Sequence, residues 1–352
     1  MKRKALVTGI TGQDGPYLAK LLLEKNYNVY GLLPRRSKQD FYNLDYLNIK
    51  NDVEYFVGDV TDYNCMHKVI SDIKPNEVYN LAAQSFVGNS WELSSVTSDI
   101  NAFGPLNILN AIKNIDEKIK FYQASTSELY GNSCDKIQNE NTKFEPCSPY
   151  AIAKLYAYWT TVNFRKSYNM FCTNGILFNH ESPIRGIEFV TRKITDGIAQ
   201  IICGKQKYLT LGNLDAKRDW GFAGDYVEAM WLMMQAEKPD DFVVATQTQF
   251  SIRDFLKLAF EEVNISNWEQ YIKVNKDFKR PVDVNSLCGN YNKAKKTLGW
   301  VPKTSFKELV QLMVREDLKR HEKQSVDIKL LKDLKKTKRI DLVNISKKKI
   351  SA

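Results

Sequence analysis

The stretch KALVTGITGQDG at residues 4–15 decides the fold. Its apolar first half predicts a short β-strand, and the largely apolar residues 17–23 that follow predict a helix. Gly9, Gly12 and Gly15 lie in the turn between these two elements. Glycines at a strand-to-helix turn allow a tight bend, and they let backbone N–H groups and the helix N-terminus approach a pyrophosphate. The sequence therefore predicts a dinucleotide-binding site at the beginning of an α/β fold.

Further strands are predicted downstream of this turn, at residues 28–33, 55–60, 78–85 and 120–124. Small residues fill the end of the 78–85 segment, where a backbone must pass close to a cofactor. In doubly wound sheets, ligands bind at the C-terminal ends of the strands. We therefore expect an α/β fold with a doubly wound parallel sheet of the Rossmann type and a smaller C-terminal substrate-binding lobe.

The length and composition of the chain suit this arrangement. At 352 residues it exceeds a minimal single domain, and 43% hydrophobic with 26% charged residues is typical of a globular enzyme. We expect a Rossmann domain with the catalytic residues at 1–175. A lobe at 176–320 is expected mainly to bind substrate, with some segments returning to the first domain. Residues 321–352 are expected to form a basic tail.

The turn after the second strand, Pro34-Arg35-Arg36-Ser37, bears on which dinucleotide is bound. An acidic residue at this distance normally holds the ribose 2′-hydroxyl of NAD. Two arginines stand there instead, and a guanidinium suits a 2′-phosphate by charge and by fork geometry. The pattern favours NADP as the cofactor, and a solvated basic turn is the alternative. Asp59, near the end of the third predicted strand, is expected to meet the adenine.

Tyr150 and Lys154 lie four residues apart in the segment SPYAIAK. Ser148 suits the N-cap of a helix and Pro149 its first turn, so the segment predicts a helix with both functional side chains on one face. A nearby cation favours the ionised form of a phenol, whose unperturbed pKa is about 10. The pair is therefore predicted to form a general base usable near neutral pH. An ordinary amphipathic helix with a surface lysine is the alternative.

The net charge of +10 is concentrated near the C-terminus. Residues 321–352 contain ten Lys or Arg against four acidic residues, and no aromatic residue. Without rings on which bases stack, this basic segment is a weak indicator of nucleic-acid binding, so we expect no nucleic-acid partner. No apolar run reaches the roughly 18 residues needed to cross a bilayer, and no signal peptide precedes the first strand. We therefore expect no membrane partner and a cytoplasmic protein.

Six cysteines and three histidines offer no metal-binding pattern. No two cysteines form a C-x-x-C pair, and histidines are too few to complete a ligand cluster. We predict no metal site, and free thiols that mostly fill the core.

Long ungapped segments carry a resemblance to a known family. They include ALVTGITGQDG, YNLAAQSFV, FYQASTSELYG, SPYAIAKLYAYW and LGNLDAKRDWG. The G-x-x-G-x-x-G turn and the Y-x-x-x-K pair are typical of the short-chain dehydrogenase/reductase superfamily. The chain resembles its extended branch and, more narrowly, the GDP-mannose 4,6-dehydratase family, from about residue 3 to residue 318.

The resemblance implies a hydro-lyase that uses NADP catalytically. Hydride leaves C4 of the mannose ring of GDP-mannose, water is lost across C5 and C6, and the hydride returns to C6, giving GDP-4-keto-6-deoxymannose. In that scheme Tyr150, helped by Lys154, removes the C4 hydroxyl proton, and Thr126 hydrogen-bonds the same oxygen. Glu128 removes the C5 proton and passes it to the departing C6 hydroxyl. A structural carboxylate that caps the following turn is the alternative for Glu128.

The resemblance also implies binding residues. The predicted cofactor contacts are Gly9, Thr11, Gly12, Gln13, Asp14, Gly15, Arg35, Arg36, Asp59, Val60, Leu81, Ala82, Ala83, Gln84, Ser85, Tyr150, Lys154, His180 and Arg185. The predicted substrate contacts are Ser85, Thr126, Glu128, Asn179, Val190, Lys193, Arg218 and Arg280. Val190 and Lys193 are expected near the guanine. The two arginines are expected at the diphosphate, because a guanidinium suits a pyrophosphate.

The sequence departs from the family pattern in two loops. Residues 183–189 are PIRGIEF where the family usually has PRRGENF, and residues 221–226 are GFAGDY where it has GHAKDY. GDP-D-glycero-D-manno-heptose is therefore the alternative substrate. A sugar-nucleotide epimerase or reductase is less favoured, because epimerases usually lack the glutamate at position 128. A catalytically silent binder is disfavoured because the tyrosine and lysine are both present. Family members commonly form dimers or tetramers, so we expect a homodimer or homotetramer.

Overall fold

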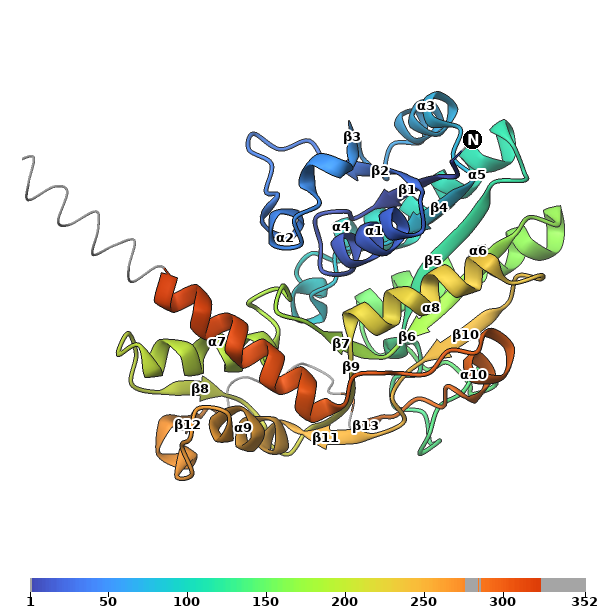
Figure 1. Cartoon of the computed structure of the whole chain (residues 1–352). Coiled ribbons are helices and arrows are strands. Elements are labelled where there is room, and N and C mark those ends of the chain that lie inside the picture. Colours follow the sequence, from blue (N-terminus) through green and yellow to red (C-terminus); the bar gives the residue numbers. More distant parts are fainter. Residues whose placement is uncertain (1, 276–283, 285, 324–352) are drawn as a thin grey trace, which may run out of the picture.

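The computed structural model describes residues 2–275, 284 and 286–323 of the chain. At its centre is a parallel sheet of seven strands in the order β10-β6-β5-β4-β1-β2-β3 (Figure 1). Its strands are β1 (Lys4–Thr8), β2 (Asn28–Leu33), β3 (Glu54–Val57), β4 (Glu77–Asn80), β5 (Lys120–Thr126), β6 (Cys172–Leu177) and β10 (Asp241–Val244). The predicted Rossmann-type sheet is confirmed.

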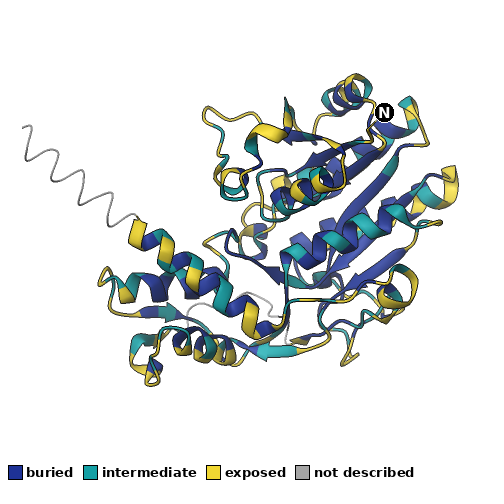
Figure 2. Cartoon of the chain, in the orientation of Figure 1, coloured by how far each residue is buried: buried dark blue, intermediate teal, exposed yellow. Residues whose placement is uncertain are grey.

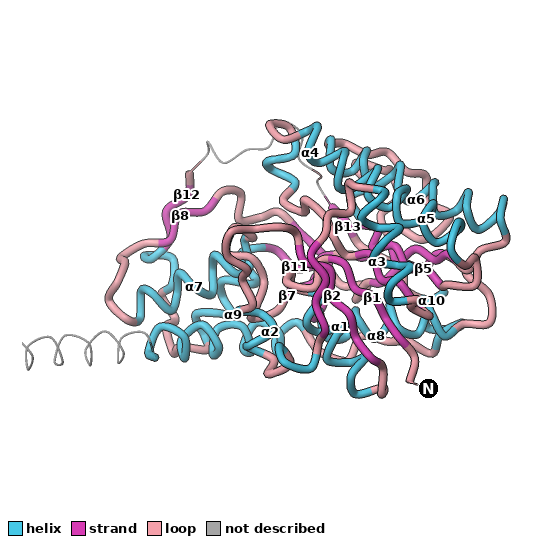
Figure 3. The backbone as a smooth tube through the Cα atoms, turned by 90° about the horizontal axis from the view of Figure 1, so that it is seen from above, coloured by secondary structure: helices cyan, strands magenta, loops and turns pink. Residues whose placement is uncertain are grey.

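Helices cover both faces of this sheet, as the view from above shows (Figure 3). One face carries α3 (Tyr63–Ile73), α5 (Gly104–Ile115) and α6 (Pro149–Tyr168), and the other carries α1 (Asp14–Glu24), α8 (Ala223–Gln235) and α10 (Asn292–Leu298). Side chains alternate along a strand, so Ala5 and Val7 pack beneath α1 and α8 whereas Leu6 packs beneath α3 and α5. The central strands are buried on both sides (Figure 2). Burial on both faces explains their nearly continuous apolar sequences.

Short helical segments complete the connections around the main sheet. They are α2 (Tyr42–Tyr46), α4 (Ser94–Ser98), a π-helical turn (Asp99–Phe103) and 3₁₀ turns at Lys50–Asp52, Val87–Ser90 and Ser127–Leu129.

A second, smaller group of strands is organised around β9 (Lys217–Phe222). β9 pairs antiparallel with β11 (Gln249–Ser251) and parallel with β7 (Asn179–Glu181) and β13 (Ser286–Leu287). A separate parallel pair is formed by β8 (Leu209–Leu211) and β12 (Ile272–Val274), the latter preceded by a 3₁₀ turn at Trp268–Tyr271. A separate hydrophobic core joins β8, β9, β11 and β12 to α7 (Val190–Ile202), α9 (Ile252–Glu261) and the helix at 306–323.

The chain crosses between the two groups of strands more than once. A single residue lies between the end of β6 at Leu177 and the start of β7 at Asn179, so the chain passes directly from the main sheet to the smaller one. β10, which lies far along the sequence, returns to form the edge of the main sheet. The domain boundary predicted at residue 175 falls within β6.

Two strands end earlier than the sequence predicts. β3 ends at Val57 and β4 at Asn80, not at 60 and 85. After β4, the backbone N–H groups of Leu81 and Ala82 both donate to the hydroxyl of Thr8, at 3.1 Å, so they are not available to a neighbouring strand. The residues beyond both strands therefore form loops at the C-terminal edge of the sheet.

The other predictions about composition have mixed outcomes. Only Cys172 and Cys288 are buried, so the prediction that the cysteines mostly fill the core is wrong. Within the described residues, no helix is both long and apolar enough to cross a membrane. The same residues contain no group of three His, Cys, Asp or Glu side chains placed to hold a metal ion. Of the predicted basic tail, only residues 321–323 lie in the described part of the chain.

Candidate active site

Three adjoining cavities open along the C-terminal edge of the main sheet. The turn cavity, of about 440 Å³, lies against the glycine-rich turn. The central cavity, of about 170 Å³, lies beyond the ends of β5 and β6, and the distal cavity, of about 290 Å³, lies between β9 and α7. Asp14 and Arg185 line both the turn and central cavities, and Asn179 and Arg218 line both the central and distal cavities. The three therefore form one continuous site.

The backbone of the glycine-rich turn is held tightly. Gly9 has a left-handed φ of 69°, and its carbonyl accepts from the N–H of Gly12 at 3.0 Å. A Cβ on Gly15 would lie 2.5 Å from the same carbonyl oxygen. The side-chain amide of Asn43 donates to the carbonyls of Thr11 and Gly12, at 3.0 and 2.8 Å. Only glycine fits at Gly9 and Gly15, as a close backbone approach requires.

Most predicted cofactor residues line the turn or central cavity. Those at the turn cavity are Gly9, Thr11, Gly12, Gln13, Asp14, Gly15, Arg36, Asp59, Val60, Leu81, Ala82, Ala83, Ser85 and Arg185. Tyr150, Lys154 and His180 line the central cavity instead. Arg35 is exposed and Gln84 bonds to Phe86, and neither lines any of the three cavities.

The predicted helix begins where the sequence places it. Ser148 is the N-cap of α6, and its hydroxyl accepts from the N–H of Ala151 at 3.1 Å. Pro149 occupies the first turn, and Tyr150 and Lys154 point into the central cavity from one face. Both are almost fully buried, with 8% and 3% exposure. The alternative of a surface lysine is therefore wrong.

The predicted electrostatics of this pair need correction. The ammonium of Lys154 donates to the carbonyl of Ala124 at 2.9 Å and lies 6.0 Å from the centre of the Tyr150 ring. Burial raises the pKa of Tyr150 to about 12, although a hydrogen bond with Thr126 lowers it. Burial also lowers the pKa of Lys154 to about 8. The expected lowering of the tyrosine pKa is wrong for this structure, because desolvation by burial is the largest influence on it.

Thr126 is the last residue of β5, and Glu128 lies two residues later in the 3₁₀ turn that follows. The Thr126 hydroxyl accepts from the N–H of Glu128 at 3.2 Å and so caps the 3₁₀ turn Ser127–Leu129. The Glu128 carboxylate lines the central cavity and makes no hydrogen bond or ion pair with any described residue. The alternative in which this carboxylate caps the turn therefore fails, because the threonine already does so.

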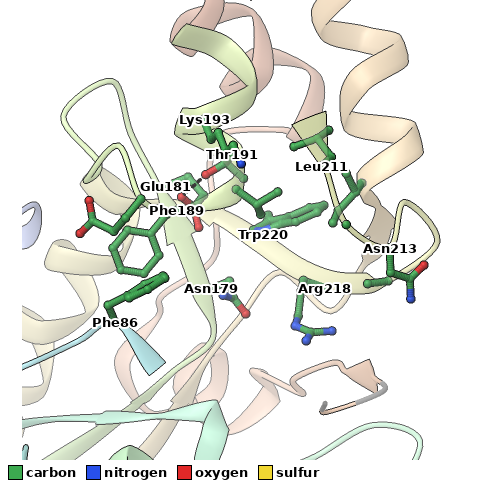
Figure 4. Close-up of a pocket in the computed structure, with 15 residues that line it drawn as sticks. Phe86, Asn179, Glu181, Phe189, Thr191, Lys193, Leu211, Asn213, Arg218 and Trp220 are labelled. Carbon is green, nitrogen blue, oxygen red and sulfur yellow. Dashed lines mark hydrogen bonds between the residues drawn. The ribbon is translucent and has the colours of Figure 1, made fainter. Parts of the chain in front are cut away.

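The distal cavity collects side chains of several kinds (Figure 4). The rings of Phe86 and Phe189 lie edge to face, 5.7 Å apart, on the side opposite Arg218. The predicted substrate residues that line it are Asn179, Val190, Lys193 and Arg218. Ser85, Thr126 and Glu128 lie in the central cavity, and Arg280 falls outside the described residues.

Comparison with known proteins fixes the family. A family model described as GDP-mannose 4,6 dehydratase matches residues 6–313. The chain belongs to the GDP-mannose 4,6-dehydratase family. The GDP-mannose 4,6 dehydratase of Dictyostelium discoideum is 47% identical over 342 residues, which cover 90% of this chain and 96% of that protein. The corresponding protein of Homo sapiens is 47% identical over 338 residues, covering 89% and 91%.

Solved structures share the fold of this family member at lower identity. UDP-glucose 4-epimerase from Thermotoga maritima superposes with a TM-score of 0.80 at 24% identity, covering 90% of this chain and 99% of that one. A dTDP-glucose 4,6-dehydratase from Bacillus anthracis gives a TM-score of 0.79 at 20% identity, covering 91% and 98%. Dehydratases and epimerases thus share the architecture, and the side chains of the central cavity must distinguish them.

The departures from the GDP-mannose 4,6-dehydratase pattern lie mostly away from the cavities. Of the altered positions, only Glu188 lines one, the distal cavity. Ile184 is buried, and Phe222 packs against Tyr17 with ring centres 5.4 Å apart. A Cβ on Gly224 would lie 2.3 Å from the Phe222 ring, so the two changes in that loop accommodate each other.

Several lining residues are absent from the sequence-based set. In the distal cavity they include Phe86, Phe189, Leu211, Gly212, Asn213 and Ala216. Gly212 and Asn213 directly follow β8, and a polar turn at the end of a strand is a signal that sequence reasoning could have used. The two phenylalanines carry no such signal, because apolar residues are common in the core and their ring contact joins distant segments.

Proposed function

We propose that this protein converts GDP-mannose to GDP-4-keto-6-deoxymannose by 4,6-dehydration, with NADP as a recycled cofactor. The observation that carries the proposal is that Tyr150 and Glu128 line one cavity, placed between the glycine-rich turn and a nucleotide-sized recess. Membership of the GDP-mannose 4,6-dehydratase family supports the same reaction. An epimerase would have no use for the carboxylate at this position.

The turn cavity fits a dinucleotide. The glycines of the turn let its backbone face the cavity, and α1 begins at Asp14, so the helix N-terminus suits a pyrophosphate. Arg36 lines the cavity beyond β2, where its guanidinium suits a 2′-phosphate, and this favours NADP over NAD. Asp59, which follows β3 and lines the same cavity, is proposed to meet the adenosine. When bound, oxidised NADP would supply a hydride acceptor and a positive charge.

We assign acid–base roles to the side chains of the central cavity. Tyr150 takes the proton of the C4 hydroxyl as C4 is oxidised. Burial raises the pKa of this phenol, and a positive charge close to it, from Lys154 or from the bound cofactor, lowers the pKa from that raised value. Thr126, which hydrogen-bonds the phenol, orients the same oxygen. Glu128 takes the proton from C5, acidified by the adjacent ketone, and passes it to the C6 hydroxyl, which leaves as water. As C6 takes the hydride back, C5 recovers a proton from solvent, which completes the 4-keto-6-deoxy product. Lys154 is fixed by the Ala124 carbonyl behind the phenol.

The distal cavity is proposed to hold the GDP moiety. Both Arg218 and Lys193 line this cavity, and we propose that the first binds the diphosphate and the second the guanine. The case for GDP-D-glycero-D-manno-heptose rested on the altered loops, but only Glu188 among those positions lines a cavity. This favours GDP-mannose.

A substrate panel tests the proposal. Purified protein with catalytic NADP is incubated separately with GDP-mannose, GDP-D-glycero-D-manno-heptose and UDP-glucose, and products are weighed by mass spectrometry. We expect a 4-keto product lighter by one water from GDP-mannose. Faster dehydration of the heptose would reassign the substrate, and a product that differs from its substrate only in stereochemistry would reject the dehydratase proposal.

We further propose a homo-oligomer that uses an apolar stripe on α6. Ile152, Tyr156 and Trp159 lie on one face of the helix and are 44–58% exposed. The ring of Phe103 extends the stripe, 5.7 Å from that of Tyr156. Large exposed apolar patches mark interfaces. Trp159→Glu is expected to reduce the mass seen by light scattering, whereas an unchanged mass would exclude the stripe as the contact.

A further inference from the structure

Three hydrogen bonds join the glycine-rich turn to a segment that is far away in sequence, two of them at His180 of β7 and one at Ser182, the residue that follows this strand. The Gln13 amide donates to the carbonyl of His180 at 3.0 Å, and the Ser182 hydroxyl donates to the Gln13 amide oxygen at 2.9 Å. The third bond joins the His180 Nε2 to the Asp14 carboxylate at 2.8 Å. We call these four residues the latch.

Within the latch, His180 and Asp14 form a charged pair only if the His180 ring carries a proton on each nitrogen. Its Nδ1 lies 2.7 Å from the carbonyl of Phe178, which can only accept, so Nδ1 donates. Its Nε2 faces a carboxylate oxygen, which also accepts when ionised. Burial lowers the pKa of His180, but the charge and hydrogen bond of Asp14 outweigh this and raise it. The pair is thus imidazolium and carboxylate.

The protein surrounds this pair with further restraints. The His180 ring stacks on Tyr226 of α8, with centres 4.7 Å apart. Both members of the pair are largely shielded from water, with side-chain exposures of 11% for the histidine and 19% for Asp14. Burying two charges is costly unless their geometry is maintained, so the pair resists separation of the turn from β7.

The latch lies where the two ligand sites meet. Asp14 lines both the turn and central cavities, and Asn179, next to His180 on β7, lines both the central and distal cavities. β7 pairs with β9, with Asn179 opposite Trp220 and His180 opposite Gly221. β9 in turn carries Arg218. The turn is therefore connected through one strand pair to the side chains of the distal cavity.

We propose that the latch couples the two sites, so that a dinucleotide in the turn cavity tightens binding of the nucleotide diphosphate in the distal cavity, and the reverse. The inference rests on the proposed function, which places these ligands in these cavities. A ligand that orders the turn also fixes β7 through the latch, and the second ligand then has less to order. Asp14 and His180 act here as positioning residues, and Gln13 and Ser182 complete the restraint.

Binding calorimetry on the full chain tests the coupling. The Kd of GDP is measured with and without saturating NADP, and the Kd of NADP with and without saturating GDP. For the unmodified protein we expect each ligand to tighten the other by the same factor, at least about fivefold. Asp14→Asn keeps the shape of the side chain but loses its charge, and we expect its factor to fall to within about twofold of unity. Ser182→Ala, at a residue that lines none of the three cavities, is expected to give an intermediate factor.

A matched control separates coupling from stability. Asp241→Asn weakens another buried pair, with Arg165 at 2.6 Å, between α6 and β10. We expect this variant to melt at a lower temperature and to keep the coupling factor of the unmodified protein. If both ligands bind the unmodified protein independently, or if Asp14→Asn and Ser182→Ala keep its full factor, the coupling is wrong and the proposed function stands. If neither ligand binds, the proposed function fails and the coupling with it.

Discussion

The turn cavity and the distal cavity are built from different materials. The turn cavity has a stretch of wall made of backbone and small residues at the ends of parallel strands, including three glycines whose Cβ positions are already crowded, and charged side chains such as Arg36 and Asp59 complete it. The distal cavity is walled by long charged and aromatic side chains from short strands and from α7. A surface made of backbone offers donors in fixed positions, whereas a surface made of side chains can be altered one residue at a time.

The two cavities should therefore respond to different substitutions. An added methyl group at a glycine of the turn should disrupt dinucleotide binding. The loss of a charged side chain should weaken binding at the distal cavity. The proposed chemistry in the central cavity, which lies between these two, depends on the ionisable side chains of Glu128, Tyr150 and Lys154. Variants chosen for each of the three regions can show whether binding and chemistry are divided in this way.

The largest effect is expected at the central cavity. Glu128→Gln removes the proposed base for C5 and keeps the shape of the side chain. We expect kcat to fall by roughly 10²- to 10⁴-fold, with NADP and GDP binding unchanged within about twofold. Steady-state kinetics and calorimetry check both parts. A variant that misfolds, or that keeps its rate, would give the carboxylate a structural role or none.

A single methyl group should disable the turn cavity. Gly15→Ala places a Cβ 2.5 Å from the Gly9 carbonyl oxygen, so the turn must move. We expect NADP affinity to fall roughly 10- to 100-fold, while GDP affinity measured without NADP changes little. Gly197→Ala in α7 is the control, because the atoms nearest its Cβ are the side-chain ends of Leu209 and Gln206 and not backbone. Equal losses in both variants would contradict the backbone argument.

Loss of one charge should weaken the distal cavity alone. Arg218→Met removes the guanidinium proposed for the diphosphate and keeps much of the side-chain length. We expect GDP affinity to fall by roughly 10- to 100-fold and NADP affinity, measured alone, to stay within about twofold. Arg253→Met is the control, since Arg253 pairs with Asp215 at the surface and lines none of the cavities. A comparable loss of GDP binding there would show a general charge effect.

The smallest effect is a pH dependence that originates at Lys154. Burial lowers its pKa to about 8, while the charge of Asp14 raises it. The side chain is charged below this pKa, so kcat is expected to fall above pH 8, by up to about tenfold per pH unit. Asp14→Asn should shift this decline to lower pH. A profile identical in both proteins would contradict the assignment.

Titration of Lys154 and unfolding at high pH can be distinguished, because the free energy of unfolding changes in opposite directions in the two cases. The pKa of Lys154 is lower in the folded protein than its ordinary value of 10.5. Between pH 8 and 10.5 the unfolded chain therefore binds more protons at this residue, and its contribution to the free energy of unfolding rises with pH. Melting curves recorded across the same range would show whether other groups unfold the protein first.

The features that could be predicted from the sequence depend on residues that are close together along the chain. The glycine turn, the Ser148 cap and the Tyr150–Lys154 face each follow from spacing along a few positions, and the structure has them as predicted. The end of β4 could not be predicted, because the Thr8 hydroxyl that binds the later backbone comes from another strand.

What the sequence could not predict depends on contacts between distant segments. Asp14 and His180 are 166 positions apart, and only the fold brings their side chains into a bond. The raised pKa of Tyr150 is likewise a result of burial, which residue types alone do not specify. Arg35 and Arg36 could not be distinguished by type either, yet only the second lines the turn cavity.

Isotope transfer within the sugar tests the central claim most directly. GDP-mannose carrying deuterium at C4 is incubated with the protein and a catalytic amount of unlabelled NADP, and the product is examined by mass spectrometry and by NMR at C6. The account predicts a 4-keto product that has lost one water and retains the deuterium at C6. Retention of the full substrate mass, or loss of the label with net formation of reduced cofactor, would contradict it.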